Sequence, residues 1–97
     1  MDFKIEIRPL ATIEIIEAFD WYELQREALG IEFLNELEIF INTLRINPKT
    51  YSFYKESVRQ GQINRFPYTV VYEIIDASVI IYSVFMARQN PGKKRIQ

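Results

Sequence analysis

Three arginines in the C-terminal half of the chain are the side chains best suited to chemistry on an anion. They are Arg59, Arg65 and Arg88. A guanidinium group offers planar pairs of N–H donors that match a phosphate or a carboxylate. An arginine that alternates with apolar residues along a strand is also a common solvated side chain. Two interpretations therefore stay open: an anion-binding cluster, or a solvated sheet surface.

Aromatic residues surround these arginines in the sequence. They are Phe66, Tyr68, Tyr72 and Tyr82. Aromatic rings on a sheet can stack on the bases of single-stranded RNA. The same rings are also ordinary core residues, which is the simpler interpretation for most of them.

Several kinds of chemistry are excluded by composition. The chain has no Cys and no His, so disulfides, zinc sites of Cys or His, thiol nucleophiles and imidazole acid–base catalysis are absent. The three glycines lie far apart, so no glycine-rich phosphate loop exists. We predict no metal site and no small-molecule cofactor. Four carboxylates in a helix predicted over residues 10–28 have the spacing of a solvated helix surface; they are Glu14, Glu17, Asp20 and Glu23.

Charge is divided unevenly along the chain. Residues 1–38 contain ten acidic and three basic residues, whereas residues 39–97 contain three acidic and nine basic residues. Either these are two solvated faces of one domain, or the C-terminal part presents a cationic surface to an anionic partner.

The N-terminal half of the chain predicts a strand and two helices. Alternation of Phe3, Ile5 and Ile7 with charged residues predicts a strand over 3–8. Apolar residues at helical spacing predict a helix over 10–28 and a second over 33–44, which ends before Asn47-Pro48. Gly30 stands where a helix C-cap is expected. Trp21 and Tyr22 are expected in the core or in the packing of the helical hairpin.

The C-terminal half predicts three strands after a connector at 49–56. They span 57–66, 68–75 and 78–86, with a tight turn at 76–78. The fold class is therefore α+β, in the order β-α-α-β-β-β. A helical hairpin packs on one face of a small, mainly antiparallel, four-stranded sheet. We predict one domain over residues 1–91 and a flexible basic tail at 92–97.

The predicted location is the cytoplasm. The first ten residues alternate charged and apolar side chains, which is unlike a secretory signal. No apolar run approaches the roughly 20 residues of a membrane span. The absence of Cys is compatible with a reducing compartment.

Several sequence elements, in this order, resemble the RelE/ParE toxin superfamily, in the group of plasmid stabilisation system proteins. They are Asp20-Trp21-Tyr22-Glu23, Asn47-Pro48, Arg59, the run Arg65-Phe66-Pro67-Tyr68 continuing into Val70 and Tyr72, and Arg88 followed by Pro91. The resemblance extends from residue 5 to residue 91.

The resemblance implies the toxin of a bacterial type II toxin–antitoxin pair, which inhibits growth and is neutralised by a cognate antitoxin. RelE-like members cleave mRNA in the ribosomal A site, whereas ParE-like members poison DNA gyrase and are not nucleases. The cellular target is therefore either ribosome-bound mRNA or DNA gyrase.

A RelE-like site would use Arg59, Arg65 and Arg88 as catalytic residues that hold the scissile phosphate. Two departures speak against that subtype: Met86 stands where many relatives carry His, and the chain ends without a terminal Tyr or Trp. A third possibility is a degenerate member of the superfamily that has lost toxicity and only binds its partner.

Overall fold

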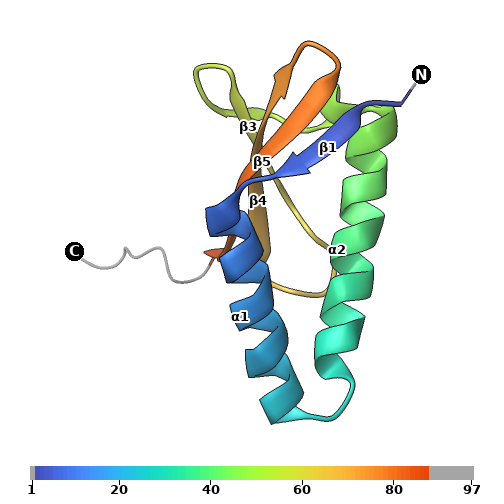
Figure 1. Ribbon diagram of the computed structural model, residues 1–97, viewed down its shortest axis with the longest axis vertical. Helices are drawn as coiled ribbons and strands as arrows, with labels where there is room; N and C mark the ends of the chain where they lie inside the picture. Colours follow the sequence, from blue (N-terminus) through green and yellow to red (C-terminus); the bar gives the residue numbers. More distant parts are fainter. Residues whose placement is uncertain (1, 88–97) are drawn as a thin grey trace, which may run out of the picture.

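The computed structural model describes residues 2–87 as two helices packed on one sheet (Figure 1). The predicted domain end at residue 91, the tail at 92–97 and Arg88 lie outside the described residues. The elements follow one another as β1 (Lys4–Ile7), α1 (Pro9–Gln25), α2 (Leu29–Ile46), the 3₁₀ turn η1 (Pro48–Thr50), β2 (Phe53–Lys55), β3 (Val58–Gln62), β4 (Tyr68–Ile75) and β5 (Ser78–Met86).

The sheet has five strands in the order β1-β5-β4-β3-β2. β1 pairs with β5 in parallel, and the other three pairings are antiparallel. The α+β class, with two helices packed on one sheet, is confirmed, and the mainly antiparallel pairing is compatible with the observed sheet. The sequence predicts four strands, and the fifth strand, β2, lies inside the predicted connector. The exposed side chains of Phe53, Tyr54 and Lys55 give no alternation from which a strand can be recognised.

The two helices form an antiparallel hairpin because the connection between them is only three residues long. Pro9 begins α1 directly after β1, in the first turn where a missing N–H costs nothing. Ala28 has a φ of 70° and turns the chain into α2. The left-handed residue of this junction is therefore Ala28.

Gly30 is not a helix C-cap, because it lies in the first turn of α2. A Cβ atom at Gly30 would lie 2.7 Å from the carbonyl oxygen of Phe19 and 2.8 Å from Cγ of Glu23. Glycine is required here by the close approach of two helices, and its conformational freedom is not used.

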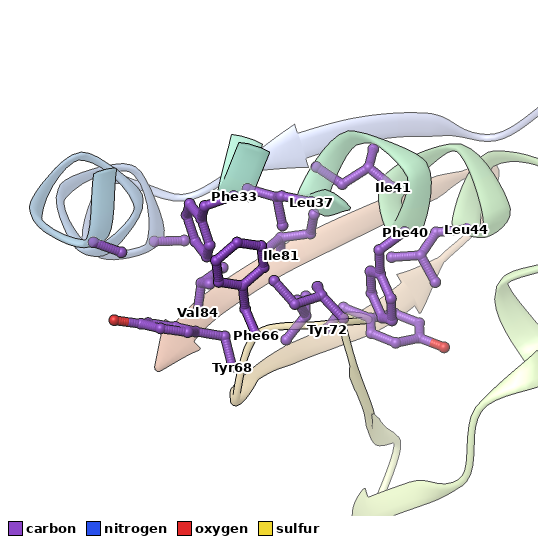
Figure 2. Close-up of a cluster of buried hydrophobic side chains, with 14 of the residues drawn as sticks. Phe33, Leu37, Phe40, Ile41, Leu44, Phe66, Tyr68, Tyr72, Ile81 and Val84 are labelled. Carbon is purple, nitrogen blue, oxygen red and sulfur yellow. The ribbon is translucent and has the colours of Figure 1, made fainter. Parts of the chain in front are cut away.

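The core lies between the helical hairpin and the central strands. Figure 2 shows Phe33, Leu37 and Phe40 of α2 facing Tyr72 of β4 and Ile81 of β5. Phe33, Tyr72 and Ile81 are fully buried. Each such side chain contributes about 1.5–3 kcal/mol through the removal of apolar surface from water. The hairpin and the sheet therefore depend on each other for burial.

A β-bulge in β5 changes which side chains reach the core. Val71 lies opposite Ser83 whereas Tyr72 lies opposite Ile81, so Tyr82 is an extra residue on β5. Ile81 and Val84 are consequently both buried although they are three residues apart. The bulge therefore interrupts the alternation of faces along β5 at Tyr82.

The strand register separates the two faces of the sheet. Directly opposite residues share a face, so Arg59 lies on the helix-covered face with Tyr72. The other face, which no described helix covers, carries two rows of paired residues, Gln60 with Val71 and Ser83, and Gln62 with Thr69 and Phe85. We call it the open face.

Candidate binding surfaces

Arg59 is held by contacts within the protein. Its Nη1 donates hydrogen bonds to the carbonyl oxygens of Tyr51 at 2.7 Å and Lys49 at 3.4 Å. Its guanidinium carbon lies 4.0 Å from the ring centroid of Phe53. The side chain is part-buried and fixes the segment before β3 against the sheet.

Arg65 connects the loop between β3 and β4 to α2. Its Nη2 lies 2.8 Å from Glu32 Oε1, and its Nη1 lies 3.8 Å from Glu36 Oε2. The hydrogen bond from Arg65 lowers the pKa of Glu32, and the same bond raises the pKa of Arg65. The guanidinium groups of Arg65 and Arg59 share no partner.

The sequence therefore located two arginines whose contacts are internal to the domain. Neither lies among the residues that line the two clefts described below. Arg88, the third predicted member, is beyond the described residues, so the three-arginine site remains a prediction.

A carboxylate network on the open face joins two strands and the turn before β3. Glu73 accepts a hydrogen bond from the Ser57 hydroxyl at 2.5 Å and another from the Tyr82 hydroxyl at 2.6 Å. Both hydrogen bonds lower the pKa of Glu73, and the bond from Ser57 has the larger effect. The carboxylate of Glu73 raises the pKa of Tyr82. The network ties β5 to β4 and to the loop before β3.

A neutral cleft of about 460 Å³ lies on the open face. The lining residues within 2–87 carry no charge, and they are Tyr54, Gln60, Gly61, Gln62, Thr69, Phe85 and Ala87. Amide and hydroxyl groups there can exchange hydrogen bonds with a partner. The described lining offers no cation that would hold a phosphate.

A second cleft, of about 620 Å³, lies between α1 and the end of β5, and we call it the α1–β5 cleft. It is lined by Glu14, Glu17, Ala18, Trp21, Tyr22, Pro67, Tyr68, Val84, Phe85 and Met86. The α1–β5 cleft thus combines two carboxylates with apolar side chains, and four of its lining residues are aromatic.

Two residues of this cleft differ from their predicted roles. The sequence predicts Trp21 and Tyr22 in the core or in the packing of the helical hairpin; Tyr22 is buried, whereas Trp21 is 50% exposed. The sequence predicts Glu14 on a solvated helix face. Its Oε1 instead accepts hydrogen bonds from the Ser83 hydroxyl and the Val84 N–H, both at 2.8 Å.

A sequence signal for Glu14 does exist. Glu14 stands three residues after Ala11 and four before Ala18, both of which are buried. An acid so close to the buried stripe of a helix faces a neighbouring element, where it needs hydrogen-bond donors.

Neither a metal site nor a membrane span is found in the described part of the chain. No group of three or more Asp or Glu side chains within residues 2–87 could hold a metal ion. Over the same residues, neither helix is long and apolar enough to cross a bilayer.

Comparison with known proteins identifies the fold. No family model matches the sequence, and no curated protein matches it. Eleven chains of solved structures match the structure. One belongs to the chromosomal ParDE toxin–antitoxin system from P. aeruginosa, with a TM-score of 0.76 at 10% sequence identity, over 87% of this chain and 95% of that chain. This chain therefore has a fold that occurs in a toxin–antitoxin system.

Proposed function

We propose that this protein is the toxin of a type II toxin–antitoxin pair and that a cognate antitoxin neutralises it. The carrying observation is the shared fold, which extends over 95% of a chain from the ParDE system. The sequence elements that resemble the RelE/ParE superfamily support the same proposal independently. Both partners would act in the bacterial cytoplasm.

The contacts of the arginines favour a toxin that acts by binding a protein. Arg59 is bonded to backbone carbonyls, and Arg65 is paired with Glu32. A residue that stabilises a phosphate in the transition state must present its donors to the substrate. We therefore infer a ParE-like mode of action, with DNA gyrase as the target.

Charge favours the same mode of action. Residues 2–87 contain thirteen acidic and eight basic residues, and four of the twelve basic residues of the chain follow residue 87. A protein that enters an RNA-lined site gains affinity from cationic contacts to phosphates. The described domain is acidic overall and lacks that advantage.

Toxicity is tested by inducible expression in a bacterial host. Growth should stop on induction, and co-expression of the neighbouring antitoxin-like reading frame should restore growth. Unimpaired growth while the folded protein accumulates to a high level would contradict the proposal.

The target is tested by two assays on the purified protein. We expect loss of supercoiling by purified DNA gyrase and no ribosome-dependent cleavage of mRNA. Cleavage that is lost in Arg59→Ala and Arg88→Ala would instead establish the RelE-like alternative.

A non-toxic binding module is the second candidate. The internal contacts of both described arginines favour it, because they leave no reactive cluster in residues 2–87. Its signature would be tight binding to the neighbouring gene product without growth arrest or gyrase inhibition.

A further inference from the structure

Within residues 2–87, the second half of β5 has a free edge. β1 pairs only with Ser78–Ile81, although β5 continues to Met86. Beyond Ile81 no described strand pairs with β5 on the side away from β4. A free strand edge presents N–H and C=O groups that can pair with an extended peptide.

Glu14 protects part of this edge in the free protein. Its Oε1 accepts the Val84 N–H, which would otherwise point to a neighbouring strand. A carboxylate placed against an edge is one way to prevent unwanted pairing between sheets. The bond also positions a negative charge at the floor of the α1–β5 cleft.

The negative charge of this cleft is not balanced within the described structure. Glu14 Oε2 and both oxygens of Glu17 have no hydrogen bond or ion pair among residues 2–87. No Lys or Arg is among the lining residues that the structure describes. A cationic occupant would complete this electrostatic arrangement.

Apolar groups lie beside the two carboxylates. Trp21 is half exposed at the cleft, and Tyr68, Val84 and Met86 contribute further apolar surface. An indole face attracts both apolar side chains and cations. An extended peptide alternates its side chains, so its cations and its apolar groups can contact different parts of the cleft lining.

We propose that the α1–β5 cleft binds an extended, basic segment of a partner protein, which lies along the Tyr82–Met86 edge. Its Lys or Arg side chains pair with Glu14 and Glu17, and its apolar side chains lie on Trp21. The partner would be the antitoxin, so this assignment of the partner rests on the proposed function.

The test uses a fluorescein-labelled ten-residue peptide in which Lys and Val alternate. Binding is measured by anisotropy and by the emission of Trp21, the single tryptophan of the chain. We expect saturable binding that weakens with salt, and slower amide exchange at residues 82–86. A peptide in which Glu replaces Lys should not bind, and a fully N-methylated peptide should bind at least tenfold more weakly.

Matched variants locate the site. Glu17→Gln should weaken binding about two- to fivefold, as expected for loss of an exposed ion pair. Glu38→Gln on α2, also exposed, is the control and should leave binding unchanged. Trp21→Ala should weaken binding about fivefold or more, read by anisotropy.

Three results would overturn the assignment. One is peptide binding that is insensitive to Glu17→Gln and Trp21→Ala. Another is exchange protection at β2 or at the outer edge of β1 in place of residues 82–86. The third is self-association through the cleft, seen as a concentration-dependent dimer that excludes the peptide. Growth arrest is measured separately. A negative result for peptide binding at the cleft can therefore be distinguished from a negative result for toxicity.

Discussion

The acidic residues of α1 have distinct tasks that depend on what each carboxylate faces. Glu23 accepts hydrogen bonds from the N–H groups of Ala28, Gly30 and Ile31, at 3.2, 2.7 and 3.3 Å. These groups are at the start of α2, where N–H donors lack partners within the helix and the helix dipole favours negative charge. Glu23 thereby joins the two helices.

Gly30→Ala should destabilise the protein by about 1–3 kcal/mol. The new methyl group would lie 2.7 Å from the Phe19 carbonyl oxygen, a backbone atom that cannot turn aside. Urea denaturation followed by circular dichroism measures the loss. An unchanged midpoint would show that the helices separate easily.

Ala28→Gly is the matched variant two residues away, and it should stabilise the protein where Gly30→Ala destabilises it. Ala28 has a φ of 70°, which costs a non-glycine residue about 1–2 kcal/mol. Glycine removes that cost but loses more entropy on folding. We expect a net gain of up to about 1 kcal/mol in the same denaturation experiment.

Tyr72→Phe should change the stability of the protein at alkaline pH. Burial raises the pKa of Tyr72 to about 12, and its hydroxyl donates a hydrogen bond to the Pro48 carbonyl oxygen at 2.5 Å. In the unfolded chain the pKa is about 10. The folded state therefore holds the proton more tightly, and this stabilisation is complete below pH 10 and lost as pH rises toward 12.

The variant lacks this titration. Its free energy of unfolding should be lower by about 1–3 kcal/mol at pH 7, because the Pro48 carbonyl loses its donor. Between pH 10 and 12 its stability should fall less steeply than that of the wild type, by up to about 1.4 kcal/mol per pH unit. Tyr68 and Tyr82 are present in both proteins, so their titration does not contribute to the difference between the two slopes. Identical slopes would contradict the assignment to Tyr72.

At the scale of elements, the short strand β2 is stabilised by one side chain. β2 has three residues and, among the described strands, pairs only with β3. Arg59 of β3 lies over the Phe53 ring and bonds to the carbonyl oxygen of Tyr51. Such a short hairpin is marginal by itself, so these contacts maintain its position.

Arg59→Ala should therefore act mainly on this hairpin. We expect a loss of about 1–2 kcal/mol, from a charge-assisted hydrogen bond and a cation–π contact, with faster amide exchange at 53–55. Arg26→Ala, at an exposed ion pair with Glu32, is the control and should leave exchange at 53–55 unchanged. If Arg59→Ala leaves stability and exchange unchanged, Arg59 is available for a functional role.

At the scale of the whole molecule, the helical hairpin and the sheet form one cooperative unit. α1 buries Ala11, Ala18 and Tyr22, while α2 buries Phe33 and Leu44 among others. Their partners include residues of β4 and β5, which follow in the sequence. Neither layer has a core of its own.

Two measurements test this cooperativity. Thermal unfolding of the full chain should give one transition, with the same midpoint by near- and far-ultraviolet circular dichroism. A fragment of residues 1–47 should be largely unfolded, because isolated helices of this length are marginal in water. A fully helical fragment would show that the hairpin folds independently.

The sequence by itself determined the fold class and the order of all helices and strands except β2, because periodicity reports directly on which side chains must be buried. Val70, Tyr72 and Val79 are recognisable as sheet residues from β-prone runs, and the helical spacing of Phe33, Leu37 and Leu44 predicts α2. The absence of His and Cys excludes whole classes of chemistry, because those reactions need a thiol or an imidazole group.

Only the tertiary structure decided which charged residues are engaged within the fold and which face a cleft. By residue type Arg59 and Arg65 are candidates for anion binding, yet their partners, Tyr51 and Glu32, are brought to them by packing. The position of Glu14 beside the buried stripe of α1 indicates that it faces a neighbouring element, but only the placement of β5 beside α1 decides that its partners are Ser83 and Val84. Local sequence pattern reports burial, whereas the partners of a charge depend on segments distant in the chain, as the sequence separation of 70 between Glu14 and Val84 illustrates.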